Sequence, residues 1–127
     1  MPTRARLASF IVHAICQAKR AVVIRMLVDT GATYTMIPRK AALAAGLDLA
    51  AVTRRTAVIT ASTVEYVPLL RVPVWRCLGI ELRNVEMICH DLPPESAVDG
   101  LLGLDFLRHF TPFQRFQRNI HPFLVRQ

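Results

Sequence analysis

Short runs of residues that favour β-strands recur along this chain and limit its fold more than any other feature. These runs are rich in Val and Ile, and turn-forming residues separate them. Residues 39–45, between Pro38 and Gly46, favour one short helix. Many short strands with few helices predict a closed all-β fold rather than alternating β–α units. The strand-like runs are residues 9–16, 21–28, 33–37, 55–60, 64–70, 72–77, 82–90 and 98–107, the last of which runs into a second short helix.

The segments between these runs carry recognisable turn signals. The polar residues 17–20 join the first two runs and predict a hairpin. Ala61-Ser62-Thr63, Pro73 and Leu78-Gly79 interrupt the later runs, and residues 91–96 hold two prolines that cannot donate to a ladder. The pattern therefore predicts breaks at all four places.

Length and composition favour one folded domain. The chain has 127 residues, of which 53% are hydrophobic, and this excludes the low-hydrophobicity class of disordered proteins. We expect a single domain over residues 1–127, with its core at about 9–110 and a separate C-terminal segment at 111–127. Arginines cut every apolar run well short of a bilayer's thickness, so we expect no membrane span.

The N-terminal segment and the cysteines point to a reducing compartment. His13 and Gln17 interrupt the first apolar run, and Lys19-Arg20 stands where a signal peptide would have small residues, so we expect a first strand and a cytoplasmic protein. The three cysteines form no CxxC pair. We expect them to be reduced and buried.

The net charge of +7 raises the question of nucleic acid. Only Lys19 and Lys40 are lysines, so arginine supplies fourteen of the sixteen cations. The cations cluster only after Asp105, and no motif of a known nucleic-acid reader accompanies them. Nucleic-acid binding is therefore not expected as the main function.

One carboxylate lies directly between an expected strand and a glycine turn. The apolar run 21–28 leads directly into Asp29-Thr30-Gly31. A glycine there lets another group approach the backbone closely, which suits a reactive site. The simpler interpretation is an Asx turn, in which Asp29 bonds only its own backbone.

A second motif favours the reactive site. Leu101-Leu102-Gly103 follows Asp29-Thr30-Gly31-Ala32 by about seventy residues and precedes a short helix. Together these motifs resemble the retropepsin-like, or retroviral-type, aspartic peptidases, and especially their single-domain bacterial and cellular members. The resemblance spans about residues 9–110. It implies an all-β, closed acid-protease barrel with one or two short helices, in which Leu101, Leu102 and Gly103 support the catalytic loop and both leucines lie in the core behind Asp29.

The resemblance also implies a mechanism. Two carboxylates share one proton, and one activates a water while the other protonates the scissile carbonyl. This chain has one Asp-Thr-Gly, so a symmetric homodimer must supply Asp29 twice. By resemblance, Thr30 bonds across the two-fold axis, Gly31 contacts a peptide or protein substrate, and Ala32 leaves room for it. No metal or other cofactor is required. The implied activity is that of an aspartic endopeptidase; the alternative is a dimerisation or peptide-binding module with little turnover.

Relatives of this family close a hairpin flap over the substrate. Ala61, Ser62 and Thr63 fall where its tip should contact the substrate. Thr63 stands where relatives carry glycine, which predicts a stiffer flap or a different turn. An ordinary hairpin connection without a gating role is the alternative.

Three other features leave alternatives open. Residues 113–125 could supply a strand to the dimer or could cap the core of their own chain. Cys89-His90 could suggest a metal, but neighbouring residues of a strand face opposite ways. Asp105 is expected to cap or brace the short helix that follows Gly103.

Overall fold

The order of elements follows from the strand-like runs and their turns. The structure is a computed structural model that describes residues 10–59 and 61–110. Its elements are β1 (Ile11–Gln17), β2 (Ala21–Val28), β3 (Met36–Ile37), α2 (Arg39–Ala44), the 3-10 helix η1 (Leu49–Ala51), β4 (Arg55–Ile59), β5 (Val64–Cys77), β6 (Ile80–Cys89), β7 (Gly100–Leu102) and α3 (Leu104–Leu107).

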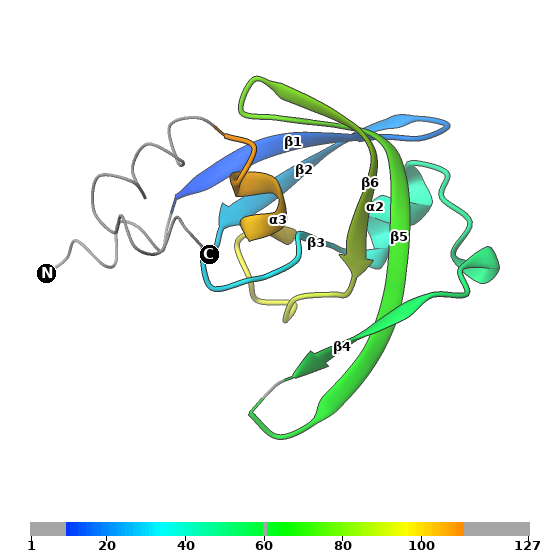
Figure 1. Ribbon diagram of the computed structural model, residues 1–127, viewed down its shortest axis with the longest axis vertical. Coiled ribbons are helices and arrows are strands. Elements are labelled where there is room, and N and C mark those ends of the chain that lie inside the picture. Colours follow the sequence, from blue (N-terminus) through cyan, green and yellow to red (C-terminus); the bar gives the residue numbers. More distant parts are fainter. Residues whose placement is uncertain (1–9, 60, 111–127) are drawn as a thin grey trace, which may run out of the picture.

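Six of the strands close into a barrel. Their order is β1-β2-β7-β3-β6-β5, and β1 pairs with both β2 and β5, which closes the ring. β4 pairs with β5 outside this ring, and the β4–β5 hairpin extends away from the barrel (Figure 1). The predicted all-β closed barrel with one or two short helices is therefore confirmed, and its α-helices are α2 and α3. Among the described residues, no helix is long and apolar enough to cross a membrane.

The predicted break at Pro73 is wrong. β5 is one strand of 14 residues that runs through Pro73. Its ladder with β6 pairs Val72 with Val85 and Val74 with Arg83, and it omits the pair between Pro73 and Asn84. Proline lacks only the N–H, so a strand tolerates it where no ladder bond is required of it. The break at Leu78-Gly79 is real, because both residues have positive φ and form the two-residue turn between β5 and β6.

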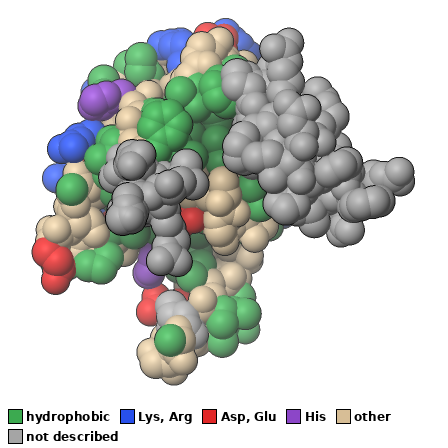
Figure 2. All heavy atoms as spheres, turned by 90° about the vertical axis from the view of Figure 1, so that its left-hand side faces the viewer, with side chains coloured by type: hydrophobic (Ala, Val, Ile, Leu, Met, Phe, Trp, Pro, Cys, Tyr) green, Lys and Arg blue, Asp and Glu red, His purple; other side chains and the backbone are tan. Residues whose placement is uncertain are grey.

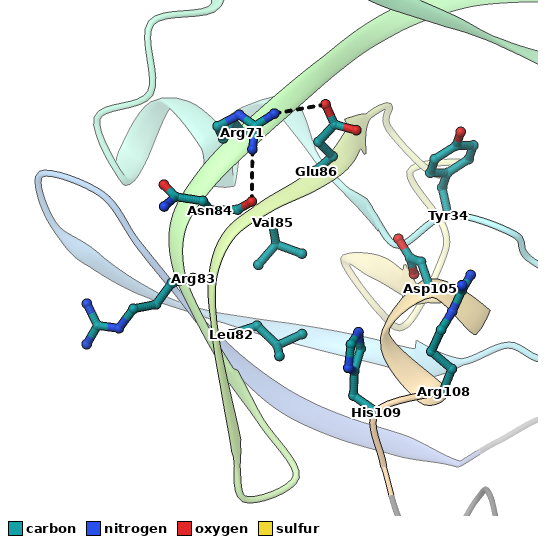
Figure 3. Close-up of a pocket in the computed structure, with 10 residues that line it drawn as sticks. All are labelled: Tyr34, Arg71, Leu82, Arg83, Asn84, Val85, Glu86, Asp105, Arg108 and His109. Carbon is teal, nitrogen blue, oxygen red and sulfur yellow. Dashed lines mark hydrogen bonds and ion pairs between the residues drawn. The ribbon is translucent and has the colours of Figure 1, made fainter.

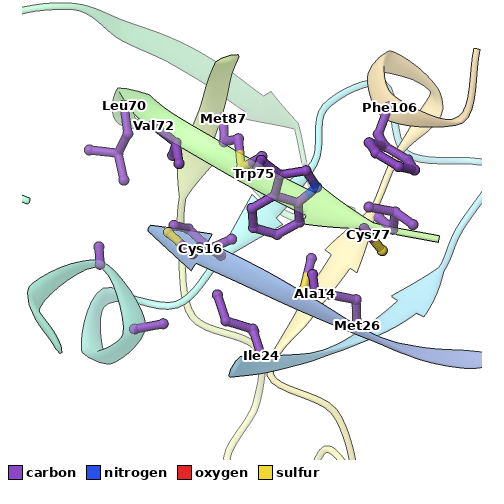
Figure 4. Close-up of a cluster of buried hydrophobic side chains, with 14 of the residues drawn as sticks. Ala14, Cys16, Ile24, Met26, Leu70, Val72, Trp75, Cys77, Met87 and Phe106 are labelled. Atoms are coloured by element: carbon purple, nitrogen blue, oxygen red, sulfur yellow. The ribbon is translucent and has the colours of Figure 1, made fainter. Parts of the chain in front are cut away.

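The core lies inside the barrel. Ala14 and Cys16 of β1 and Ile24 and Met26 of β2 are buried there, with the two-residue spacing that the period of a strand requires. Trp75 of β5 lies at the centre of this cluster, and Phe106 of α3 covers one end (Figure 4). α2 adds Ala41, Ala42 and the adjoining Ala45. All three cysteines are free and buried, as predicted.

Candidate active site

The Asp29 loop begins where β2 ends beside β7. β2 and β7 run parallel with Val28 opposite Leu102, and the Asp29 amide donates to the Leu102 carbonyl oxygen at 3.0 Å. Asp29 Oδ1 accepts a hydrogen bond of 2.9 Å from the Gly31 amide. The Asx turn is therefore present. It uses one carboxylate oxygen only, because Oδ2 accepts no hydrogen bond from the part of the chain that the structure describes.

The residues around Asp29 leave this carboxylate accessible. Asp29 and Ala32 are half-buried, while Thr30 and Gly31 are exposed. A Cβ built on Gly31 would lie 3.2 Å from Asp29 Oδ1, which is tighter than ordinary contact. Glycine therefore keeps the short bond between amide and carboxylate free of crowding.

A buried polar network holds the loop from behind. Thr35 is fully buried, and its Oγ1 donates to Asp105 Oδ1 at 2.7 Å and accepts from the Gly103 amide at 3.1 Å. The Thr35 amide also donates to the Asp105 carboxylate at 3.0 Å. Hydrogen bonds to a charged group are stronger than neutral ones. The network therefore ties the loop before β3 to the start of α3.

Asp105 has one of the two roles expected from the sequence, because it braces α3 but does not cap it. The N-cap of α3 is Gly103, which makes no side-chain cap bond, so Asp105 does not cap the helix. Its carboxylate accepts from Phe106 of the helix and from Thr35 of the opposite loop, which makes it a link between the two segments. Sequence reasoning missed Thr35 altogether. A threonine inside the run 33–37 was the available signal, because a hydroxyl in a buried strand needs a partner.

Gly103 lets the two segments approach closely. A Cβ at this position would lie 2.7 Å from the Tyr34 carbonyl and 2.8 Å from the Ala32 oxygen. These are backbone atoms that cannot rotate away. The Leu104 amide donates to the same Ala32 oxygen at 2.9 Å, so the loop and the start of α3 are joined along their backbones.

The two leucines before Gly103 face opposite ways. Leu102 is fully buried in the core, whereas Leu101 is half-buried and packs on a second small cluster of Met36, Val67 and Ile88. The prediction that both leucines lie in the core behind Asp29 is therefore wrong for Leu101. Adjacent residues of a strand alternate between faces, so only one of them could lie there.

A groove of about 350 Å³ lies beside the Asp29 loop. One wall is the loop after Asp29, the opposite wall is β4 of the hairpin, and the floor comes from β6 and β7. Figure 2 shows this side of the molecule, with the hairpin projecting from the body. The lining is mostly apolar, which suits the side chains of a peptide. It consists of Gly31, Ala32, Thr33, Tyr34, Met36, Ala57, Val58, Ile59, Ile88, His90 and Leu101.

The hairpin contributes its strand rather than its tip to this groove. Ala61, Ser62 and Thr63 are exposed and do not belong to the lining, whereas Ala32 does. Thr63 is not one of the residues with positive φ, which among the described non-glycine residues are Leu78 and Asn84. The tip therefore uses a turn that does not need glycine at position 63, one of the two possibilities that the sequence left open.

A second, larger hollow of about 620 Å³ lies between β6 and α3 (Figure 3). Its charged groups are engaged with each other or with the fold. Arg71 donates to the Asn84 carbonyl oxygen and pairs with Glu86, while Asp105 is bonded to Thr35. None of the four Asp29 loop residues, 29–32, lines this hollow. The groove beside Asp29 is therefore the better candidate for chemistry.

The cysteines do not supply a nucleophile. Burial raises the pKa of the Cys16 and Cys77 thiols to about 11, and burial followed by the charge of Asp91 raises the pKa of Cys89. A thiol must ionise to attack, so these groups are inert near neutral pH. Within residues 10–59 and 61–110, no three His, Cys, Asp or Glu side chains gather to hold a metal ion.

Comparison with known proteins bears on the family and the fold. A family model described as "Aspartyl protease" matches residues 18–106, well over half of the chain. The fold is similar to the crystal structure of a retropepsin-like aspartic protease from Rickettsia conorii, with a TM-score of 0.61 and 24% sequence identity over 80% of this chain and 78% of that chain. A search of curated proteins found no match. The chain therefore belongs to the aspartyl protease family, and its barrel is of the retropepsin-like type.

Proposed function

We propose that this protein is an aspartic endopeptidase that works as a homodimer, with Asp29 of each protomer in one shared dyad. The observation that carries the proposal is the Asp29 loop itself. It presents a half-buried carboxylate whose Oδ2 accepts no hydrogen bond from the described residues, and it is braced from behind by Thr35 and Asp105 and set beside a groove suited to a peptide. One chain supplies one such loop, so the second carboxylate must come from a second copy.

The dyad follows from the charge of two close carboxylates. At about 3 Å they cannot both ionise, so they share one proton and titrate as a coupled pair. The ionised Asp29 takes a proton from water, and the protonated one donates to the oxygen of the scissile carbonyl. Thr30 is exposed on the loop, where its hydroxyl is available to bond across the axis. Gly31 and Ala32 then offer their backbones to the substrate.

The β4–β5 hairpin acts as the flap in this proposal. Its strand already forms one wall of the groove through Ala57, Val58 and Ile59. Ala61, Ser62 and Thr63 extend beyond that wall and would reach the substrate only when the hairpin moves towards the Asp29 loop. Closure would shield the attacking water from bulk solvent.

A second function rests on the same fold. A dimerisation or peptide-binding module would keep the groove and the loop with little turnover. Thr63 at the hairpin tip favours this alternative, because a β-branched residue restricts the backbone more than glycine does. The intact Asp29-Thr30-Gly31-Ala32 sequence favours catalysis.

Replacement of Asp29 tests the peptidase directly. Asp29→Asn keeps an oxygen to accept the Gly31 bond but cannot ionise, so we expect cleavage of a mixed peptide library to fall by at least about 10²- to 10⁴-fold. Asp48→Asn is the matched control, because Asp48 is exposed and its Oδ1 accepts the Ala50 amide in the same way, away from the groove. Mass spectrometry of the digests measures both. Unchanged cleavage by Asp29→Asn would refute the mechanism.

Sedimentation equilibrium tests the shared site. We expect a dimer for the wild type and for Asp29→Asn, because the substitution preserves the shape of the loop. Mixing an excess of Asp29→Asn with wild type should then lower activity by forming inactive mixed dimers. A monomer at all concentrations, or activity proportional to the wild-type protein alone, contradicts the dimer.

A further inference from the structure

His90 is a polar side chain in the mostly apolar groove beside Asp29. Among the groove's lining residues within the described chain, it is the one imidazole, and its ring nitrogens can donate and accept hydrogen bonds. It belongs to the segment directly after β6, and its side chain is 31% exposed. Its neighbours on the floor, Ile88 and Leu101, are apolar. A polar group at this place is therefore available to a substrate.

The backbone fixes His90 relative to the Asp29 loop. The His90 amide donates to the Ile37 carbonyl oxygen at 3.0 Å, and β3 pairs Met36 with Ile88. β3 follows directly from the loop that Thr35 anchors. Ile88 and His90 are two residues apart and line the groove, whereas Cys89 between them points into the core. The backbone of His90 is therefore held at a set position relative to the Asp29 loop.

The imidazole is short of a hydrogen-bond partner. In the described part of the chain, its recorded polar contact is the 3.8 Å approach of Nε2 to Glu65 Oε1 on β5. This distance is longer than a hydrogen bond. Arg39 and Asp91 line another small hollow together with His90, but the Asp91 carboxylate already accepts a hydrogen bond from the Arg39 amide. His90 can thus donate to a ligand without losing an existing hydrogen bond.

We propose that His90 is a specificity-determining residue, which selects an amide side chain, glutamine or asparagine, at the subsite it lines. This inference rests on the proposed function. A peptide in the groove would cover the imidazole, and an apolar side chain there would leave its N–H unpaired. An amide oxygen accepts that N–H. A carboxylate would also accept it but would lie near the Glu65 carboxylate, which repels it. Met36, Ile88 and Leu101 take the apolar side chains of neighbouring positions.

A binding selection on inactive protein tests His90 without needing turnover. A displayed library of random octapeptides is selected for binding to the inactive Asp29→Asn variant. The same selection is carried out on three double variants, which add His90→Leu, His90→Gln or His13→Leu to Asp29→Asn. His13 is an exposed histidine on β1 and does not line the groove, so it is the matched control. Circular dichroism checks that each variant folds. Synthetic peptide pairs that differ by Gln and Leu at the enriched position then give affinities.

Asp29→Asn should enrich Gln or Asn at one position and bind the Gln peptide about three- to tenfold more tightly than the Leu peptide. His90→Leu should reverse this preference and leave the other positions unchanged. His90→Gln keeps an N–H donor and should retain part of the preference for the Gln peptide. His13→Leu should retain all of this preference. Adding Glu65→Gln should raise the affinity of a Glu peptide relative to the Gln peptide.

An unchanged profile in His90→Leu, or no enriched amide in Asp29→Asn, overturns the inference. Cleavage by the wild type is measured in parallel. Amide selection without any cleavage would refute the peptidase but keep His90 as the determinant of peptide binding. Cleavage whose specificity does not depend on residue 90 would keep the peptidase but refute His90 as the specificity determinant.

Discussion

The two walls of the groove differ in how they are held. The Asp29 wall is bonded to β7, to the start of α3 and, through Thr35, to Asp105. The hairpin wall is β4, whose ladder in the described chain is with β5 alone. The outer part of the hairpin exposes large apolar side chains: Ile59 of β4 is 79% exposed and Tyr66 of β5 is 70% exposed. One wall is fixed and the other has few restraints.

This contrast suits a site that must do two things. Acid–base chemistry requires groups held in set positions, and binding energy is then not needed to order them. Admission of a peptide requires a wall that can open. The buried network serves the first need, and the separate two-stranded hairpin serves the second. Changes to the two walls should therefore have unequal effects.

The largest effect should come from the fixed wall. Thr35→Val keeps the shape of the side chain but removes the bond to Asp105 and leaves the buried Gly103 amide unpaired. We expect the free energy of unfolding to fall by about 3–5 kcal/mol. Urea unfolding measures it, and Thr56→Val in the hairpin strand β4 is the comparison. Equal losses at both positions would contradict the contrast between the walls.

An effect that is smaller for each group should appear at alkaline pH in the barrel behind that wall. Cys16 and Cys77 ionise near pH 9 when unfolded, but burial raises their pKa to about 11 in the folded protein. Below pH 9 both states keep the proton. Between pH 9 and 11 each thiol ionises in the unfolded state but stays protonated in the folded state, which stabilises the unfolded state. The free energy of unfolding should therefore fall, by about 2–3 kcal/mol per thiol.

Urea unfolding from pH 8 to 11 checks this fall, with the double variant Cys16→Ala/Cys77→Ala as the reference. The variant should begin less stable than the wild type, and the gap should narrow as the pH rises. A constant gap would show that the two thiols keep their ordinary pKa. The part of the β4–β5 hairpin that precedes Cys77 contains no cysteine. Local opening of the hairpin should therefore not show this dependence on pH.

The smallest effect on stability should come from the hairpin tip. Thr63 does not have positive φ, so Thr63→Gly relieves no strain and only adds backbone freedom. We expect the free energy of unfolding to change by about 0.5 kcal/mol or less. Hydrogen exchange at β4 amides should nevertheless become faster, with Ser96→Gly in the loop before β7 as the control. Slower exchange would mean that Thr63 already loosens the tip.

Much of the fold could be predicted because its signals are local. The run 21–28 is a strand with those bounds, and Leu78-Gly79 forms the predicted turn. Pro73 misled the prediction, since its effect depends on whether the partner strand needs its N–H. Leu101 also misled the prediction, because a sequence motif does not show which face of the strand each side chain occupies. Residues 113–125, which could supply a strand to the dimer or cap the core of their own chain, lie outside the described residues.

The sequence by itself determined the β-rich pattern and the place of the Asp29 carboxylate, because strand periodicity and a strand-to-glycine turn are properties of neighbouring residues. Only the tertiary structure decided what surrounds that carboxylate. Thr35 and Asp105 are separated by 70 positions and meet through a 2.7 Å bond. His90 reaches the groove because β3 and β6 run parallel there. Contacts of this kind depend on how the barrel closes, and barrel closure depends on strand pairings between distant parts of the chain.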